Sequence, residues 1–336
     1  MKSRTAIIIV LIAFGFVPHG ISADVPHYVA TTTVLQDIVK NVVGDKAVVD
    51  TLMDIGVDPH DYQPSAEDSS KLQDADFVFF FGGGVEEVLS NTLDTLLADG
   101  KAFSVTDALP KDVLLPSDEQ NHAFNPHVWM DPTIMQIAVS NITDVLVERD
   151  PANGATYLSN GANYISELSN LHNSTLIETN KIPEGQRFLV TQHNAFSYWT
   201  ERYNFEYRSL EGISTTDEVS LKEIDNLAKY LKDNEIKVIY LETTVPDTQA
   251  QAVIQATEAI GWKVGIGGTL FSGSLGEGNA STYIGMMSTN ARTIVEGILN
   301  PPANAGSVQA PFQILSGIFA FAIIVLSRRK HRKQNE

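Results

Sequence analysis

The feature that most constrains the fold is a run of five apolar residues at positions 77–81, closed at once by three glycines. The run has the length of a β-strand and offers no polar side chain on either face. Such a strand is expected to be covered on both sides, as in parallel sheets that lie between layers of helices. This part of the chain therefore favours a layered α/β fold.

Strand-like and helix-like segments alternate on both sides of a central helical stretch. Strands are expected at residues 28–32, 48–53, 77–81, 188–192, 205–210, 238–241 and 263–266. Helices are expected between them at residues 34–43, 65–72, 86–97, 196–202, 221–232, 248–260 and 283–299. This alternation predicts two α/β units with mainly parallel sheets.

The stretch between the two units, residues 132–180, has a helical pattern that Asp150 and Pro151 are expected to interrupt. After the interruption, apolar side chains spaced by seven, four and three residues share one helix face: Tyr157, Tyr164, Leu168 and Leu171. The pattern alone fits either a stiff helical connection between two domains or an ordinary helix inside one of them.

Both ends of the chain read as segments outside the folded body. Residues 1–23 have a basic start, an apolar run and a small-residue cleavage site, which is typical of a secretory signal, with an uncleaved anchor as the alternative. Residues 311–327 are uncharged and nearly all apolar, and the basic tail 328–336 follows. This order predicts a transmembrane anchor with its tail inside; the alternative is a sorting signal that is later removed.

Composition excludes several kinds of chemistry. The chain has no cysteine, so disulfides, thiolate metal sites, iron–sulfur clusters and a lipid-modified N-terminal cysteine are all ruled out. The formal net charge is −18, and the body without its two basic ends has 16 basic and 40 acidic residues. This balance argues against a nucleic-acid partner and suits either a cationic ligand or simply a soluble surface.

Three of the six histidines in the body stand in well-defined loops: His60, His127 and His193. A proline precedes each of the first two, and the third follows an expected strand. Ligands in open α/β sheets bind beyond the carboxyl ends of strands, and imidazole suits Zn²⁺ and other first-row metals. Taken singly, however, a loop histidine is more often a solvated or hydrogen-bonded residue than a metal ligand.

The body resembles the zinc/manganese-type solute-binding proteins of ABC importers, the ZnuA/TroA-like family (cluster A-I). The resemblance covers about 275 residues and five ordered motifs. The motifs are DPHDYQPS at 58–65, NPHVWMDP at 125–132, VTQHNAFSYW at 190–199, IYLETTV at 239–245 and SLGEGNASTYIGMM at 274–287. NPHVWMDP is the most specific of them.

The resemblance implies two Rossmann-like lobes joined by one long helix, with a metal ion bound between them. The ion would be delivered to a membrane permease driven by a separate ATPase, and the ectodomain is expected to be a cell-surface monomer. Combined with the end segments expected from the residue pattern, the expected order is a signal peptide (1–23), an N-terminal lobe (24–131), a helical region with the linking helix (132–181), a C-terminal lobe (182–300), a tether (301–310), a transmembrane anchor (311–327) and a cytoplasmic tail (328–336).

Carried over by motif, the metal ligands are His60, His127 and His193. The family's usual fourth ligand is acidic, but Gly273 occupies that position and has no side chain to bind a metal. Three histidines and a water make a sound zinc shell, so Zn²⁺ is favoured over Mn²⁺ or Fe²⁺. Asp61, Glu211 and Glu277 are the candidates to replace the lost carboxylate, and the sequence does not decide among them. Glu242 either supports the site or caps a helix after its strand, and His122 is either a further metal contact or a solvated loop histidine.

Two other functions remain open from the sequence. Three histidines and a water also form the inner shell of some catalytic zinc sites, so a zinc-dependent hydrolase or lyase is the alternative in the enzyme class. A metal-binding surface adhesin is the alternative among structural proteins. No general base stands out in the motifs, and a non-catalytic receptor is therefore preferred.

Overall fold

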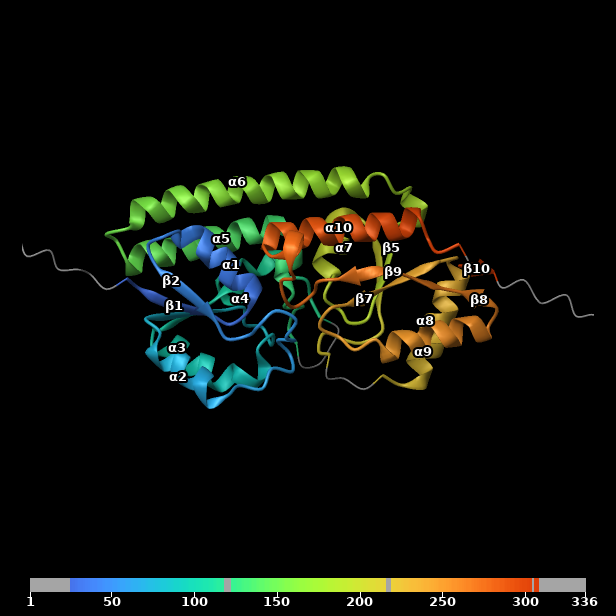
Figure 1. Cartoon of the computed structure of the whole chain (residues 1–336), viewed down its shortest axis with the longest axis horizontal. Coiled ribbons are helices and arrows are strands. Elements are labelled where there is room, and N and C mark those ends of the chain that lie inside the picture. The colour runs from blue at the N-terminus through green and yellow to red at the C-terminus, as the bar shows by residue number, and fades with distance from the viewer. Residues whose placement is uncertain (1–24, 118–121, 216–218, 304, 308–336) are drawn as a thin grey trace, which may run out of the picture.

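The computed structural model describes residues 25–117, 122–215, 219–303 and 305–307. It has two α/β lobes side by side, and the long helix α6 (Gly154–Thr179) runs above both of them (Figure 1). Helices α1, α5 and α10 lie between α6 and the sheets, while α2 and α3 cover the opposite side of the N-terminal lobe, and α8 and α9 that of the C-terminal lobe (Figure 1). The expected two-lobe α/β fold is confirmed.

The N-terminal lobe contains one parallel sheet of four strands in the order β2 (Val48–Thr51), β1 (His27–Ala30), β3 (Phe77–Phe80) and β4 (Ala102–Ser104). All four residues of β3 are buried. The short strand β4 was not expected from the sequence, because its three residues form no extended apolar run. The central position of β3 explains why both of its faces are apolar.

Side chains of β3 enter two different cores. Phe77 and Phe79 pack into the core that includes α1 (Thr33–Val43), whereas Val78 and Phe80 pack with Leu72 and Leu93. The latter two belong to helices α2 (Ala66–Asp74) and α3 (Ser90–Ala98), which cover the other face. Glu86, expected to begin a helix, instead precedes the 3-10 turn η1.

The C-terminal lobe has two parallel strand pairs, β5 (Phe188–Thr191) with β6 (Glu206–Ser209) and β7 (Val238–Glu242) with β9 (Gly265–Leu270). Strands β5 and β7 pack against each other in the middle of the lobe. The helices of this lobe are α7 (Ser197–Tyr203), α8 (Leu221–Asp233), α9 (Thr248–Ala259) and α10 (Tyr283–Leu299).

The expected tether is partly folded onto this lobe. Strand β10 (Gly306–Ser307) pairs antiparallel with β8 (Trp262–Lys263), which is an exception to the parallel pattern. The remaining short elements are α4 (Val105–Ala108) and the 3-10 turns η1 (Glu87–Leu89), η2 (Lys111–Val113), η3 (Val128–Met130), η4 (Glu184–Gln186) and η5 (Gly278–Ala280).

The central helical region consists of α5 (Pro132–Arg149) and α6, with the break at Asp150 as expected. Helix α6 packs on α1 and α5 of the N-terminal lobe and on α10 of the C-terminal lobe. Helices α5 and α6 approach closely at Gly161, where a Cβ atom would overlap the Thr143 side chain. Helix α6 therefore acts as a shared brace rather than as a helix of one lobe.

Among the described residues, none of the helices has the length and apolar character needed to cross a membrane. The expected signal at 1–23 and the expected anchor and tail at 311–336 lie outside the described residues. These segments stay predictions from the sequence.

Replacing Leu168 by alanine should destabilise the protein, because this side chain is fully buried on the inner face of α6. A buried Leu→Ala change costs about 2–5 kcal/mol of unfolding free energy. Leu176→Ala in the same helix is the matched control, since Leu176 is 38% exposed. Urea unfolding followed by circular dichroism measures both, and equal losses would contradict the bracing role.

Candidate metal centre

Three buried histidines meet between the lobes. His60 lies in the loop between β2 and α2, His127 precedes η3, and His193 follows the carboxyl end of β5. One nitrogen from each ring lies within 4.8 Å of the others, and each residue is at most 2% exposed. The Nε2 atoms of His60 and His127 are 3.1 Å apart. The N-terminal lobe thus contributes two rings and the C-terminal lobe one.

Asn125 orients the His127 ring. Its Oδ1 accepts a hydrogen bond from the His127 backbone N–H at 3.0 Å and lies 2.8 Å from Nδ1. A proton on Nδ1 therefore points to the amide oxygen, and Nε2 keeps its lone pair for the centre of the cluster. The Asn125 Nδ2 also donates across the lobes to the carbonyl of Asn194, the neighbour of His193.

Glu242 orients the His193 ring from behind. Its Oε2 lies 2.6 Å from the His193 Nδ1, and its Oε1 accepts from the backbone N–H groups of Gln192 and His193, each at 2.9 Å. Glu242 is the last residue of β7, so the carboxylate also joins that strand to the end of β5. A carboxylate behind a histidine fixes the tautomer and makes the other ring nitrogen a stronger ligand.

Asp58 orders the His60 loop. Its Oδ1 accepts from the His60 backbone N–H at 3.0 Å, and its Oδ2 accepts from the Thr215 hydroxyl of the opposite lobe. The same loop is tied to the C-terminal lobe by the Gly56 N–H, which donates to the Ser274 Oγ at 2.7 Å. The first histidine is therefore held by contacts that cross the seam.

The pKa values of the three rings shift in different directions: two are lowered and one is raised. Burial lowers the pKa of His60 to about 3, with further lowering by His193 and His122, and burial holds the pKa of His127 well below its ordinary value. Burial would also lower the pKa of His193, but the Glu242 carboxylate outweighs it, with help from Asp58 and Glu211, and the net shift is upward. Two rings are thus neutral at neutral pH, while the carboxylate of Glu242 favours the protonated form of the third.

The other suggested residues fall into two groups. Asp61 and Glu277 are exposed, and neither contributes an atom to the cluster. His122 is buried, and its Nε2 lies 4.0 Å from Glu87 Oε1, outside the cluster. Glu211 is buried beside His193, since its backbone N–H donates to the Gln192 carbonyl at 2.7 Å.

Gly273 packs directly against the His60 loop. A Cβ atom at this position would lie 2.7 Å from Cδ of Pro59, which is closer than real Cβ contacts allow. Its neighbour Ser272 accepts a 2.7 Å hydrogen bond from Trp129 Nε1 of the other lobe. Gly273 therefore offers no side chain to bind a metal, and the lack of a Cβ atom allows the two lobes to touch here.

Sequence reasoning did not identify Asn125 or Asp58 as supporting residues, although both lie in the quoted motifs, two positions before a histidine. That shared spacing was an available signal, because a side chain at this distance can accept from the histidine backbone N–H. For Glu242 the sequence left open support of the site or a helix cap, and the structure places its carboxylate against His193.

The arrangement could hold a transition-metal ion. Three imidazoles form a nitrogen donor set, in which an amide orients one ring and a carboxylate orients another.

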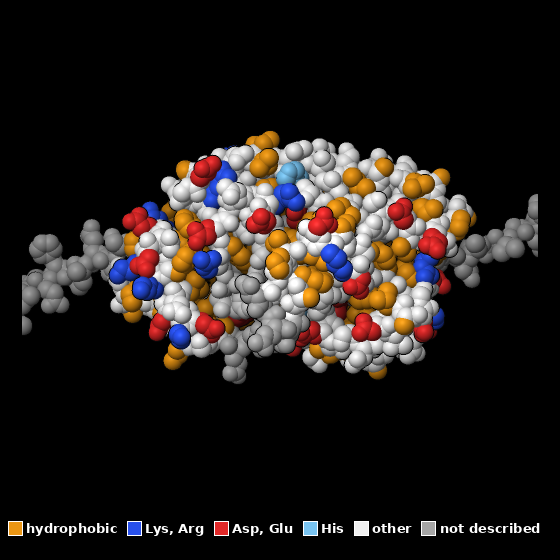
Figure 2. Space-filling model, turned by 180° about the vertical axis from the view of Figure 1, so that it is seen from behind, with side chains coloured by type: hydrophobic (Ala, Val, Ile, Leu, Met, Phe, Trp, Pro, Cys, Tyr) orange, Lys and Arg blue, Asp and Glu red, His pale blue; other side chains and the backbone are white. Residues whose placement is uncertain are grey.

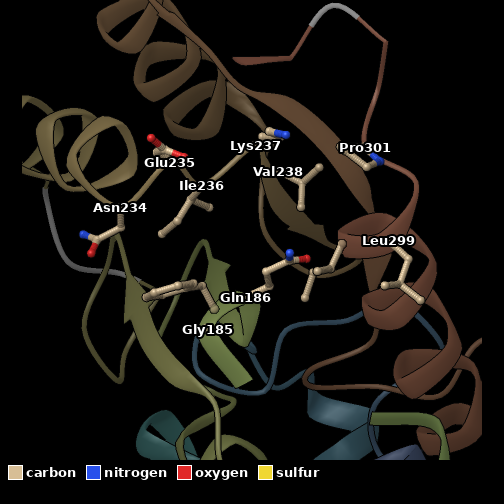
Figure 3. A pocket seen from close by; sticks show the side chains of 11 residues that line it. Gly185, Gln186, Asn234, Glu235, Ile236, Lys237, Val238, Leu299 and Pro301 are labelled. Carbon is tan, nitrogen blue, oxygen red and sulfur yellow. The ribbon is translucent and has the colours of Figure 1, made fainter. Parts of the chain in front are cut away.

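A separate cavity of about 310 Å³ in the C-terminal lobe is not lined by a set of metal-binding side chains of this kind (Figure 3). It lies at the amino ends of β5 and β7, beside Gln186, Asn234 and Leu299, whereas His193 follows the carboxyl end of β5.

The surface acidity is dispersed. Acidic side chains are scattered over the face shown in Figure 2, with lysines, arginines and apolar groups between them. The net charge of −18 is therefore not concentrated in one patch on this face.

Comparisons with known proteins identify the family of this chain. The family described as zinc-uptake complex component A, periplasmic (ZnuA) matches residues 29–297. The manganese-binding lipoprotein MntA of Bacillus subtilis is 33% identical over 282 residues, covering 83% of this chain and 92% of the relative. The zinc-binding protein TroA of Treponema pallidum is 30% identical over 272 residues, covering 80% and 88%.

Solved structures of periplasmic metal-binding proteins also resemble this chain. The periplasmic zinc-binding protein TroA from Treponema pallidum superposes with a TM-score of 0.78 at 30% identity, covering 81% of this chain and 99% of that one. The Mn-bound periplasmic metal-binding protein from Candidatus Liberibacter asiaticus gives a TM-score of 0.70 at 27% identity, with the same coverage.

Replacing Glu242 by glutamine should lower the pKa of His193, because the negative charge that raises it is removed. The amide NH₂ would also face Nδ1 and favour the tautomer with its proton on Nε2. An NMR titration of the His193 ring in the metal-free protein measures the shift. Glu201→Gln, at an exposed site of the same lobe, is the control; an unchanged His193 titration in Glu242→Gln would contradict the assignment.

Proposed function

The chain belongs to the ZnuA family of zinc-uptake complex components, and on this premise we propose that it is the extracytoplasmic receptor of an ABC metal importer. It captures Zn²⁺ between its lobes and delivers it to a membrane permease that a separate ATPase drives. The observation that carries the proposal is the meeting of three buried imidazoles, two from one lobe and one from the other.

Each residue of the centre has a defined part in capture. His60 and His127 are neutral and offer nitrogen lone pairs, whereas Glu242 favours a second proton on His193, and a proton on its Nε2 has to leave before that ring can bind. Glu242 keeps the Nδ1 proton of His193 in place and balances part of the incoming charge. The metal is the cargo, and the protein holds it without a chemical step.

Release requires the seam between the lobes to loosen. The hydrogen bonds from Asn125 to Asn194, from Thr215 to Asp58 and from Gly56 to Ser274 all cross it beside the histidines. Because α6 packs on both lobes, small shear or local loosening is favoured over a wide hinge motion.

Zinc is the proposed cargo. The names of the relatives include zinc, manganese and iron. Three nitrogen donors suit zinc, whereas manganese prefers more oxygen ligands, and the usual acidic position is Gly273 here. Mn²⁺ and Fe²⁺ are the competing ions in a binding assay.

A receptor is preferred over an enzyme because the members of this family are solute-binding components of transporters. The zinc hydrolase or lyase alternative loses support for that reason. Surface adhesion stays a prediction that these comparisons do not test. The proposed location is outside the cytoplasmic membrane, with residues 311–327 as the anchor expected from the sequence.

Alanine substitution of His60, His127 or His193 should each weaken zinc binding more than about a hundredfold. The reason is that losing even a supporting partner of a ligand costs about 10–100-fold in affinity, and these residues bind directly. Competition with a chromophoric chelator measures the affinity. His172→Ala is the matched control, because His172 lies on α6 and stacks on Tyr203, outside the cluster; wild-type affinity in all three site variants would refute the proposed site.

Zinc binding should release up to one proton at pH values below the raised pKa of His193, because the metal replaces the Nε2 proton of that ring. Affinity should fall about tenfold per pH unit below that pKa and level off above it. Calorimetry in buffers of different ionisation enthalpy counts the proton. Binding without proton release at about pH 6, below the ordinary histidine pKa, would show that His193 is already neutral in the free protein.

A further inference from the structure

The backbone carbonyl of His193 accepts more hydrogen bonds than it needs. Its oxygen lies 2.9 Å from each of three donors: the backbone N–H of Ala195, the hydroxyl of Thr191 and the hydroxyl of Tyr207. A carbonyl oxygen has two lone pairs, so two of these donors would already satisfy it. The set of three therefore goes beyond satisfying a buried polar group and restricts the direction of the carbonyl.

The two hydroxyls reach this carbonyl because of the register of β5 and β6. Tyr207 on β6 pairs with Leu189 on β5, and Thr191 lies two residues further along β5. Because alternate residues of a strand share a face, the side chains of Tyr207 and Thr191 lie on the same face of the sheet. Their hydroxyl oxygens are 2.9 Å apart, and the Tyr207 ring packs against the core that includes α1. The sheet and the core therefore hold the phenol in place.

Tyr207 also holds the far end of the histidine loop, residues 192–196. Its hydroxyl oxygen accepts a hydrogen bond from the backbone N–H of Phe196 at 3.2 Å, one residue before α7 begins. The same hydroxyl donates to the His193 carbonyl. One side chain of the neighbouring strand thus joins the residue that carries the imidazole to the start of the next helix.

The N–H and the carbonyl of His193 fix different parts of its backbone. Glu242 accepts from the N–H and faces Nδ1, so it restrains the peptide plane before the residue and one edge of the ring. Tyr207 and Thr191 restrain the peptide plane after the residue. With both planes held, the two backbone dihedral angles of His193 are set, and the direction of its Cα–Cβ bond follows from them.

We propose that Tyr207 is a positioning residue of the metal centre, which holds the His193 backbone so that Nε2 points to the ion. The inference rests on the proposed function and deepens it, since it names a residue that acts on a ligand without touching the metal. Thr191 supplies the second hydroxyl. Loss of a supporting partner of a metal ligand costs about 10–100-fold in affinity. The lower end of this range is expected here, because Glu242 still holds the ring.

The first test removes the hydroxyl and keeps the packed ring, in Tyr207→Phe. This variant should weaken Zn²⁺ binding at least about tenfold in chelator competition, and it should shift the visible bands of Co²⁺ bound as a spectroscopic substitute. Tyr230→Phe is the matched control and should change neither. Tyr230 lies on α8 of the same lobe, and its hydroxyl donates to Glu206 at 2.7 Å, outside the histidine cluster.

The second test separates the hydroxyl of Thr191 from its volume. Thr191→Val removes the hydroxyl and keeps the branched shape, whereas Thr191→Ser keeps the hydroxyl and removes a methyl group. Thr191 is buried, so a role in packing alone would make Thr191→Ser the more damaging change. The positioning role predicts the reverse order: Thr191→Val loses Zn²⁺ affinity, and Thr191→Ser binds as the wild type does.

The outcomes separate this inference from the proposed function. If the wild-type protein binds no Zn²⁺, Mn²⁺ or Fe²⁺, the proposed function itself fails. If the wild type binds Zn²⁺ and Tyr207→Phe keeps its affinity and Co²⁺ spectrum, Tyr207 is not a positioning residue, even where the Tm of the variant is lower. If Tyr207→Phe does not fold, the two Thr191 variants decide, and equal Zn²⁺ affinities of the two would overturn the proposal.

Discussion

The buried contact between Glu242 and His193 is the interaction on which the centre depends. An unpaired carboxylate at 3% exposure would be costly, and here two backbone N–H groups and an imidazole satisfy it. The same contacts hold the end of β5 against the end of β7, so the position of His193 is part of the packing of the lobe. The backbone that supports the ligand cannot move without exposing that charge.

The second constraint is the seam between the lobes. Residues that support the histidines also form bonds across it: Asn125 binds both the His127 ring and the Asn194 carbonyl, and Asp58 binds both the His60 N–H and Thr215. Each of these side chains binds a histidine and a residue of the opposite lobe, so the position of the histidine depends on the distance between the lobes. The positions of the rings and the contact between the lobes therefore depend on the same side chains, and α6 packs on both lobes.

Much of this could be predicted from the sequence because the signals are local. The apolar run at 77–81 indicated a central strand, and the Asp150–Pro151 pair indicated the break between α5 and α6. The three histidine loops were identified by motif, and the structure brings their rings together. The short strand β4 was missed because three residues carry no periodicity.

The sequence could not predict contacts between residues that are far apart in the chain. Glu242 is 49 positions from His193, and the fit of Gly273 against Pro59 joins opposite lobes. No local pattern encodes how the lobes are placed.

Charge at the centre must be balanced locally. Two of the three rings are neutral, so a divalent cation brings nearly its full charge into a buried site. Scattered surface acids are screened over about 8 Å at physiological ionic strength, and they can attract cations without stabilising one inside. The buried carboxylates around His193 are screened much less, and their charge acts directly on that ring. The electrostatics of the centre therefore depend more on a few buried acids than on the excess of acidic residues in the whole sequence.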